Sequence, residues 1–411
     1  MLLSYKYRIY PNVLQEHTLW AVFVFCRQLY NAALEERISS WKHLRKSVSY
    51  FDQVKSIKGI KKTDLITSQI IYSQVLQQVL KQVDIAFQNF FRRLKNGDKK
   101  SGFPRFKKNT KRFNSILFPQ CDFDVGGIRL SNDQKHITIF GIPGLVKIKY
   151  HRPYEGRCKN VRIVREGFKW FVVLTCDDVP QKALSSTGKT IGIDLGISTF
   201  VTTSDNIHHH HPKAYKTSKE TLAARQRKLA TKQKGSKNYR KASKSVRETH
   251  EHLTNIRHEY QHDLANKLVD QNDTIVIEKL NIVSMLEAKG FDVKNENITD
   301  ASWGSFAAKL KYKAERAGRS VIEVNPRNTS KTCSGCGTIK KSMPLNSRTF
   351  CCDKCNLSLD RDHNAALNIL RLGLSHAAPP SLKSPNVGTG HSKIMPFKTL
   401  ITLWNDSQSY S

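Results

Sequence analysis

Acidic side chains are scarce in this 411-residue chain, which carries 34 Asp and Glu against 68 Lys and Arg. The net charge of +34 and a pI of ≈ 9.9 favour a polyanionic partner, because each neutralised phosphate releases condensed counterions. A hydrophobic content of 39% is still enough for two or three packed domains. The excess charge therefore lies on folded domains, and it is typical of a protein that binds nucleic acid.

Long apolar runs are missing as well. Residues 19–26, LWAVFVFC, fall far short of the ~20 residues that a membrane-spanning helix needs. The first residues, MLLSYKYR, lack the apolar stretch of a signal peptide. We therefore expect a cytoplasmic protein with no membrane partner.

Three of the few acids interrupt segments that otherwise have the pattern of a protein core. Asp194 lies in IGIDLGISTF, on the strand face that also carries Gly192 and Gly196. Glycine there lets another backbone or a ligand come close. Glu278 ends the apolar run TIVIEKL, and Asp362 begins the helical pattern DHNAALNILRL.

A buried carboxylate is costly unless it is paired or binds a cation. Each acid alone has a structural explanation, such as a salt bridge or a strand-end turn, and for Asp362 a helix cap. Asp194, Glu278 and Asp362 together favour one shared metal site.

The cysteines are unevenly placed, with five of nine between residues 333 and 355. Cys333 and Cys336 form one Cys-x-x-Cys pair, and Cys352 and Cys355 form another. This spacing is typical of a four-thiolate zinc ribbon, and an intracellular setting argues against disulfides. Cys351 could replace Cys352 as a ligand, so the sequence does not decide between these two residues. We expect the ribbon to bind Zn²⁺ in a structural role.

Charge and periodicity organise the first half of the chain. Residues 5–11 alternate like a strand, and residues 14–41 and 68–94 have helical patterns. Residues 90–113 hold ten Lys or Arg and one acid, with phenylalanines interleaved. Such a segment can contact nucleic acid, although it could also be a solvated loop anchored by core phenylalanines. The predicted contacts are Arg92, Arg93, Lys95, Arg105, Lys107 and Lys108.

The middle of the chain changes character twice. Residues 114–180 have the pattern of short strands with turns, which indicates a small barrel or sandwich. Residues 185–189, SSTGK, have the composition of a linker. Residues 213–247 carry thirteen Lys or Arg on a long, mostly helical pattern that could lie along a duplex or form a solvated face. Four histidines at 208–211 precede it, and we assign them no function.

With these motifs in place, the chain resembles the TnpB proteins of bacterial insertion sequences, which are similar to the ancestors of type V CRISPR effectors. The resemblance runs from Tyr5 to about Leu372. The matching strings are YKYRIYPN, QVLQQVLKQVDIAFQNFFRRLKNG followed by GFPRFK, IGIDLGI, TIVIEKLNI, WGSFAAKLKYKAERAG, NPRNTSKTCSGCG and DRDHNAALNIL. Their order and spacing make the resemblance highly specific.

The resemblance implies an α+β multidomain fold with an RNase H-like (RuvC) α/β nuclease domain and an inserted zinc ribbon. The implied domains are a β-barrel, wedge-like domain at 1–10 and 111–184, a helical recognition domain at 11–110, and the nuclease domain at 185–372 with the ribbon at 330–358. Residues 373–411 lie beyond the resemblance, and their lost periodicity and their content of Ser, Pro, Gly and Lys predict a disordered basic tail. The resemblance also implies that Asp194, Glu278 and Asp362 are the three catalytic acids. Asp360 is a neighbouring acid with a smaller expected role.

The implied activity is RNA-guided cleavage of both strands of double-stranded DNA beside a short flanking motif. The guide would be an RNA from the right end of the element, bound by a protein monomer. Carboxylate oxygens favour Mg²⁺ or Mn²⁺ over zinc, and two such ions would activate water and stabilise the leaving 3′ oxygen. The protein would read the flanking motif while base pairing reads the remaining sequence.

Two other functions remain open from the sequence. A guided DNA-binding repressor or accessory regulator of transposition would share the architecture but lose the acids, and all three are present. A transposase would need a nucleophilic Tyr with a paired-His metal motif, or an acid triad within a protein that binds the element's ends. No His-hydrophobic-His motif lies beside a Tyr.

Overall fold

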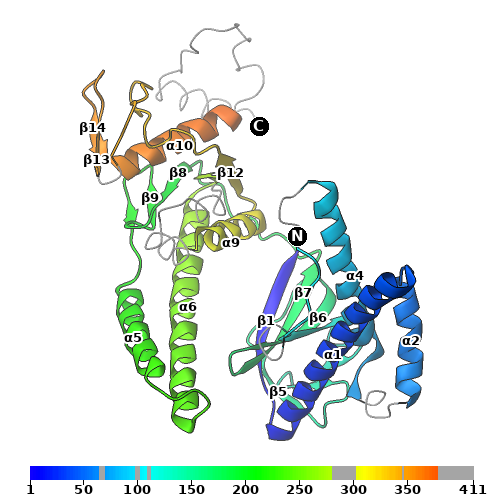
Figure 1. Cartoon of the computed structure of the whole chain (residues 1–411). Helices are drawn as coiled ribbons and strands as arrows, with labels where there is room; N and C mark the ends of the chain where they lie inside the picture. The colour runs from blue at the N-terminus through cyan, green and yellow to red at the C-terminus, as the bar shows by residue number, and fades with distance from the viewer. Residues whose placement is uncertain (64–69, 98–101, 109–112, 280–301, 345–346, 378–411) are drawn as a thin grey trace. The chain divides into compact units, whose positions relative to one another are not determined.

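The computed structural model describes residues 1–63, 70–97, 102–108, 113–279, 302–344 and 347–377 (Figure 1). The chain divides into two compact units, Met1–Pro180 and Gln181–Ser411. The first therefore contains both the helical segment and the strand-rich segment that the sequence suggested as separate domains. Most of the tail expected at 373–411 lies outside the described residues, but the last described helix continues to Ala377. No described helix is both long and apolar enough to cross a bilayer.

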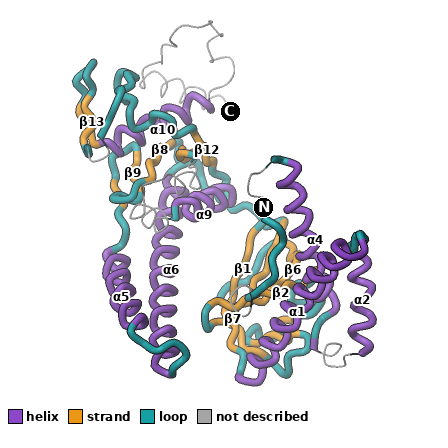
Figure 2. Tube along the Cα trace, in the orientation of Figure 1, coloured by secondary structure: helices purple, strands orange, loops and turns teal. Residues whose placement is uncertain are grey.

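A seven-stranded antiparallel sheet forms the centre of the first unit (Figure 2). Its order is β2-β6-β7-β1-β5-β4-β3, so the N-terminal strand lies between β7 and β5, which follow it by more than a hundred residues. The strands are β1 (Leu3–Tyr10), β2 (Ser115–Pro119), β3 (Ile128–Leu130), β4 (His136–Ile139), β5 (Val146–Lys149), β6 (Arg157–Glu166) and β7 (Lys169–Asp177).

Three described helices complete this unit: α1 (Val13–Leu44), α2 (Tyr50–Thr63) and α4 (Ser73–Lys95). The start of α1 is fixed by a capping box, in which the Asn12 side chain accepts from the Gln15 backbone and the Gln15 side chain accepts from the Asn12 backbone. The Gln15 amide also donates to the carbonyls of Pro143 and Leu145, which ties α1 to the sheet. The hydrophobic pattern did not indicate α2.

A five-stranded mixed sheet forms the centre of the second unit, in the order β10-β9-β8-β11-β12. Its strands are β8 (Thr190–Leu195), β9 (Val201–Thr203), β10 (His208–His209), β11 (Thr274–Glu278) and β12 (Ser320–Val324). The three strands β8, β11 and β12 are parallel, whereas β9 and β10 form an antiparallel meander beside β8.

Helices cover both faces of this sheet (Figure 1). On one face, Ile193 and Ile277 pack into a core with α6 (Lys237–Gln271) and α9 (Trp303–Arg316). On the other face, Val276 packs with Ile369 and Leu370 of α10 (Arg361–Ala377). A two-stranded ribbon of β13 (Thr349–Cys351) and β14 (Ser358–Asp360) leads directly into α10.

The helical pattern expected over 213–247 is interrupted in the structure. It forms two helices, α5 (Lys213–Ala230) and the start of α6, which lie side by side (Figure 2). Gly235 turns the chain with φ +92°, a conformation that favours glycine, and the Ser236 side chain caps α6 by accepting from the Tyr239 backbone. The basic segment is therefore a helical hairpin rather than one rod.

Candidate active site and metal centre

The strand register brings Asp194 and Glu278 together. Ile193 of β8 pairs with Ile277 of the parallel strand β11, so the next residues, Asp194 and Glu278, are neighbours at the carboxyl ends of both strands. Because successive side chains alternate between faces, both carboxylates lie on the face opposite the two isoleucines. That is the face covered by α10.

Helix α10 brings the third acid, Asp362, to the same face. A Cβ on Gly192 would lie 2.4 Å from the Ala366 carbonyl oxygen, so only glycine allows the helix backbone this close to β8. A Cβ on Gly196 would lie 4.0 Å from Oδ2 of Asp362, which places that carboxylate beside the end of β8. The predicted close approach is therefore confirmed for Gly192, whose neighbour is the α10 backbone, whereas the nearest backbone atom to a Cβ on Gly196 is the Thr199 carbonyl oxygen.

Asp194 interacts electrostatically with both of the other acids. Burial raises the pKa of the Asp194 carboxyl well above its usual range, and the charges of Glu278 and Asp362 raise it further. Burial also raises the pKa of Glu278, although a hydrogen bond from the Thr329 hydroxyl opposes this. Three half-buried carboxylates, of which Asp194 is repelled by both others, are a set of oxygen donors that could hold a cation.

Burial raises the pKa of Asp362 as well, with the charge of Asp360 adding to it. Two arginines oppose this rise. Nη1 of Arg348 lies 3.9 Å from Oδ2 of Asp362, and Arg361 acts on both Asp362 and Asp194. These arginines, Thr329 and His208, whose charge also lowers the pKa of Asp362, are neighbours of the acids that sequence reasoning missed. The position of Arg361 between two acids in DRDHN was the only local signal.

Asp360, and not Asp362, caps helix α10. Its Oδ1 accepts hydrogen bonds from the backbone N–H groups of Asp362 at 2.9 Å and His363 at 3.0 Å. The cap leaves the Asp362 carboxylate available for other partners. The sequence left open whether Asp362 is the helix cap, and the structure gives this role to Asp360.

Replacing Asp360 with Ala should lower the free energy of unfolding by about 1 kcal/mol, the usual cost of a lost N-cap. Asp360→Asn keeps an oxygen that can cap but removes the charge, so thermal melting should separate the two variants. DNA cleavage should fall much less in either variant than in Asp362→Ala. Equal loss of cleavage in Asp360→Asn and Asp362→Ala would contradict a capping role.

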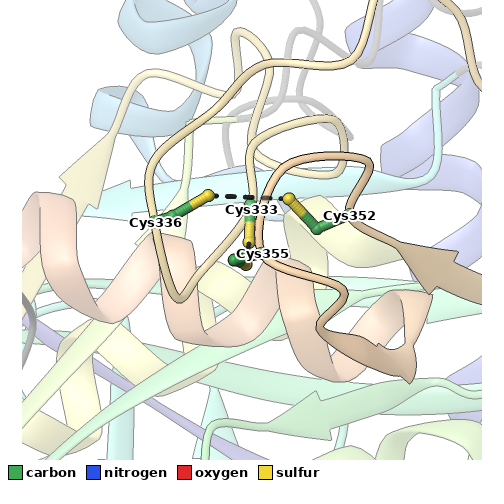
Figure 3. Close-up of side chains that lie close together, drawn as sticks. All are labelled: Cys333, Cys336, Cys352 and Cys355. Carbon is green, nitrogen blue, oxygen red and sulfur yellow. Dashed lines mark hydrogen bonds between the residues drawn. The ribbon is translucent and has the colours of Figure 1, made fainter.

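The four predicted thiolates converge at one point (Figure 3). The sulfur atoms of Cys333, Cys336, Cys352 and Cys355 all lie within 4.8 Å of one another. Among the described residues, these four side chains form the group of possible metal ligands that lie this close together. The exposed fifth cysteine, Cys351, points to Ser358 instead, with its sulfur 3.6 Å from the hydroxyl. The donor set fits zinc.

Each Cys-x-x-Cys pair closes a tight turn. The N–H of Gly337 donates to the Cys333 carbonyl, and the N–H of Asn356 donates to the Cys352 carbonyl. Gly337 and Asn356 have φ of +76° and +54°, as a residue that ends such a turn requires. Backbone hydrogen bonds lower the pKa of Cys352, whereas burial raises the pKa of Cys333.

Buried asparagines of α10 hold the segment around Cys333 to that helix. Asn364 accepts from the Ser334 N–H and donates to the Thr332 carbonyl, and Asn368 donates to the carbonyls of Thr329 and Thr332. The thiolate cluster and Asp362 are therefore attached to the same helix.

The side chains of residues 90–113 that were predicted to contact nucleic acid divide into an exposed group and a packed group. Arg92, Lys95, Arg105 and Lys108 are exposed. Arg93 donates to the Gly102 carbonyl instead, and Nζ of Lys107 lies 4.9 Å from the centre of the Tyr30 ring. The backbone of Lys107 also exchanges hydrogen bonds with the Asn31 side chain.

These features define an α+β multidomain protein with carboxylates at the carboxyl ends of two parallel strands and at the start of α10, together with a four-thiolate ribbon. Residues 172–289 match a family model described as "Probable transposase", residues 303–369 one described as "Cas12f1-like, TNB domain", and residues 1–46 one described as "Helix-turn-helix domain". In this chain, residues 1–46 form strand β1 and the single long helix α1.

Among the curated relatives, a Streptomyces pristinaespiralis protein named "Putative RNA-guided DNA endonuclease" is 33% identical over 91% of this chain and 90% of its own length. "Putative RNA-guided DNA endonuclease InsQ" of Escherichia coli is 28% identical over 90% of this chain and 92% of its own. A solved structure titled "Structure of the mini-RNA-guided endonuclease CRISPR-Cas_phi3" is 13% identical, with a TM-score of 0.47 over 91% of this chain and 92% of that one. The chain belongs to the TnpB family.

Proposed function

We propose that this protein is an RNA-guided, metal-dependent DNA endonuclease encoded by an insertion sequence, which cuts both strands of its target beside a short flanking motif. The observation that carries the proposal is the meeting of Asp194, Glu278 and Asp362 on one face of the second sheet. The extent of similarity to relatives named as RNA-guided DNA endonucleases supports it.

In this proposal the second unit is a RuvC-type, RNase H-like nuclease. A mixed sheet with helices on both faces, and acids where parallel strands end, supports this assignment. The ribbon would hold a structural Zn²⁺ through Cys333, Cys336, Cys352 and Cys355. The seven-stranded sheet and helices of the first unit would serve as the wedge-like and recognition domains.

The oxygens of Asp194, Glu278 and Asp362 fit Mg²⁺ or Mn²⁺, which prefer carboxylates. Such ions would supply an activated water and charge stabilisation for the leaving 3′ oxygen. The carboxylates must be ionised to bind cations. Because their pKa values are raised, ionisation and with it cation binding should increase as the pH rises. Arg348, exposed beside Asp362, would contact the phosphate that is cut.

Guide RNA from the element's right end and double-stranded target DNA are the proposed partners, bound by a protein monomer with one RNA. The net charge of +34 and the exposed Arg92, Lys95, Arg105 and Lys108 support contact with phosphates. The basic hairpin of α5 and α6 offers a second surface of the same charge.

The proposal is tested by expressing the chain together with the right end of its element. An RNA of defined length should co-purify, and the complex should cut both strands of a matching plasmid only when a divalent cation is present. Plasmid with a scrambled target sequence is the control. RNA-directed binding without cleavage would instead support a guided repressor, and cleavage without RNA would exclude a guided enzyme.

A further inference from the structure

Two of the candidate acids come from segments far apart in the chain, and something must hold them at fixed separation. Asp194 lies one residue before the end of strand β8, whereas Asp362 lies in the first turn of α10. The close packing of Ala366 on Gly192 fixes the position of α10 one helical turn after Asp362. The first turn itself is half-buried, so packing alone leaves its carboxylate freer to move.

Ser204, just beyond β9, is attached to β8 by two hydrogen bonds. Its backbone N–H donates to the Gly192 carbonyl at 2.8 Å, and its side-chain oxygen accepts from the Gly192 N–H at 3.2 Å. Gly192 lies two residues before Asp194 on the same strand face. The backbone of Ser204 is therefore a fixed point of the strand that carries the first acid.

His363 connects α10 to that fixed point. Its Nε2 lies 3.1 Å from the Ser204 carbonyl oxygen. Since a carbonyl oxygen only accepts, Nε2 carries the proton and donates it. Consecutive hydrogen bonds thus link His363, the residue after Asp362, through Ser204 to the strand that carries Asp194.

We propose that His363 is a positioning residue, which holds Asp362 at the separation from Asp194 that cation binding requires by donating its Nε2–H to the Ser204 carbonyl. This inference rests on the proposed nuclease function. Partners that orient metal ligands typically change metal affinity or activity by about 10–100-fold when they are removed.

Three variants of His363 separate positioning from packing. The amide nitrogen of Gln reaches about as far as Nε2 and can donate in its place, whereas that of Asn reaches only as far as Nδ1. His363→Leu fills space but cannot donate. We expect His363→Gln to behave like the parent protein, and His363→Asn and His363→Leu to need about tenfold more Mn²⁺ for half-maximal cleavage.

The same Mn²⁺ dependence should be measured without catalysis, by electron paramagnetic resonance of Mn²⁺ bound to the full RNA complex, with melting temperature and zinc content recorded for each variant. Affinities that follow the order Gln above Asn and Leu, with unchanged zinc, would support the inference. Equal Mn²⁺ affinity in the Gln and Asn variants, or a Leu variant within twofold of the parent, would overturn it. If Asp194→Ala also left Mn²⁺ binding unchanged, the nuclease assignment itself would fail.

Discussion

Replacing Asp194 with Ala should stop cleavage of both DNA strands while leaving the RNA and DNA complexes intact. The substitution removes a carboxylate from the candidate cation site, where the loss of several kcal/mol of transition-state stabilisation corresponds to about 10³-fold or more in rate. The exposed cations of α4 and of the α5–α6 hairpin are untouched, so binding should keep its steep salt dependence. Strand-specific end labels would measure both cuts, and filter binding at several salt concentrations would measure affinity.

Glu278→Ala and Asp362→Ala should give the same result, because the two strand acids and Asp362 of α10 lie at the same face of the second sheet. Asp270→Ala is a matched control, since it removes a carboxylate from the exposed side of α6 in the same unit. A second nuclease centre would be required if the Asp194 variant still cut one strand at full rate. The single-site hypothesis would then be wrong.

The sequence was most informative where chemistry is tied to short spacing. Two Cys-x-x-Cys pairs close local turns, so the convergence of four sulfurs followed from spacing and composition. Gly192 and Gly196 beside Asp194 likewise indicated a close approach, and the structure identifies the α10 backbone as the neighbour of Gly192. What the pattern could not give was the order of the strands, because the pairing of Ile193 with Ile277 joins distant segments.

Polar contacts account for most of what sequence reasoning missed. Helix α2 buries few apolar residues, and Gln53 docks it by donating to the Ala33 carbonyl and accepting from Arg37. Because these contacts are polar, they produce no hydrophobic periodicity in the sequence from which the helix could be predicted. The assignment of the α10 cap to Asp360 was missed for a similar reason, since two acids two residues apart differ only in backbone geometry.

The choice between Cys351 and Cys352 shows the limit of a motif. Both positions are compatible with a thiolate pair that includes Cys355. In the β13–β14 ribbon, Cys351 is the residue paired with Ser358 and lies exposed, whereas the following cysteine packs with Cys333 and Phe350. The alternation of a strand therefore decides a question that spacing left open.

Removing one ribbon thiolate should release zinc and weaken cleavage together. Purified protein should contain about one zinc, and Cys352→Ser should lose it because four thiolates are needed to close a structural site. Asn364 and Asn368 tie the ribbon to α10, so loss of the metal should also loosen the first turn of that helix, where Asp362 lies. Zinc by atomic absorption and hydrogen exchange over residues 329–368 would measure both effects.

Cys351→Ser is the matched control, because its sulfur points to Ser358 and lies outside the cluster. It should keep the full zinc content and cleavage rate of the parent protein. Strong chelators should reproduce the Cys352→Ser phenotype, because metal binding supplies folding free energy to small ribbons. Zinc loss in Cys351→Ser with retention in Cys352→Ser would reverse the ligand assignment. Full cleavage by zinc-free protein would show instead that the ribbon does not position the helix that carries Asp362.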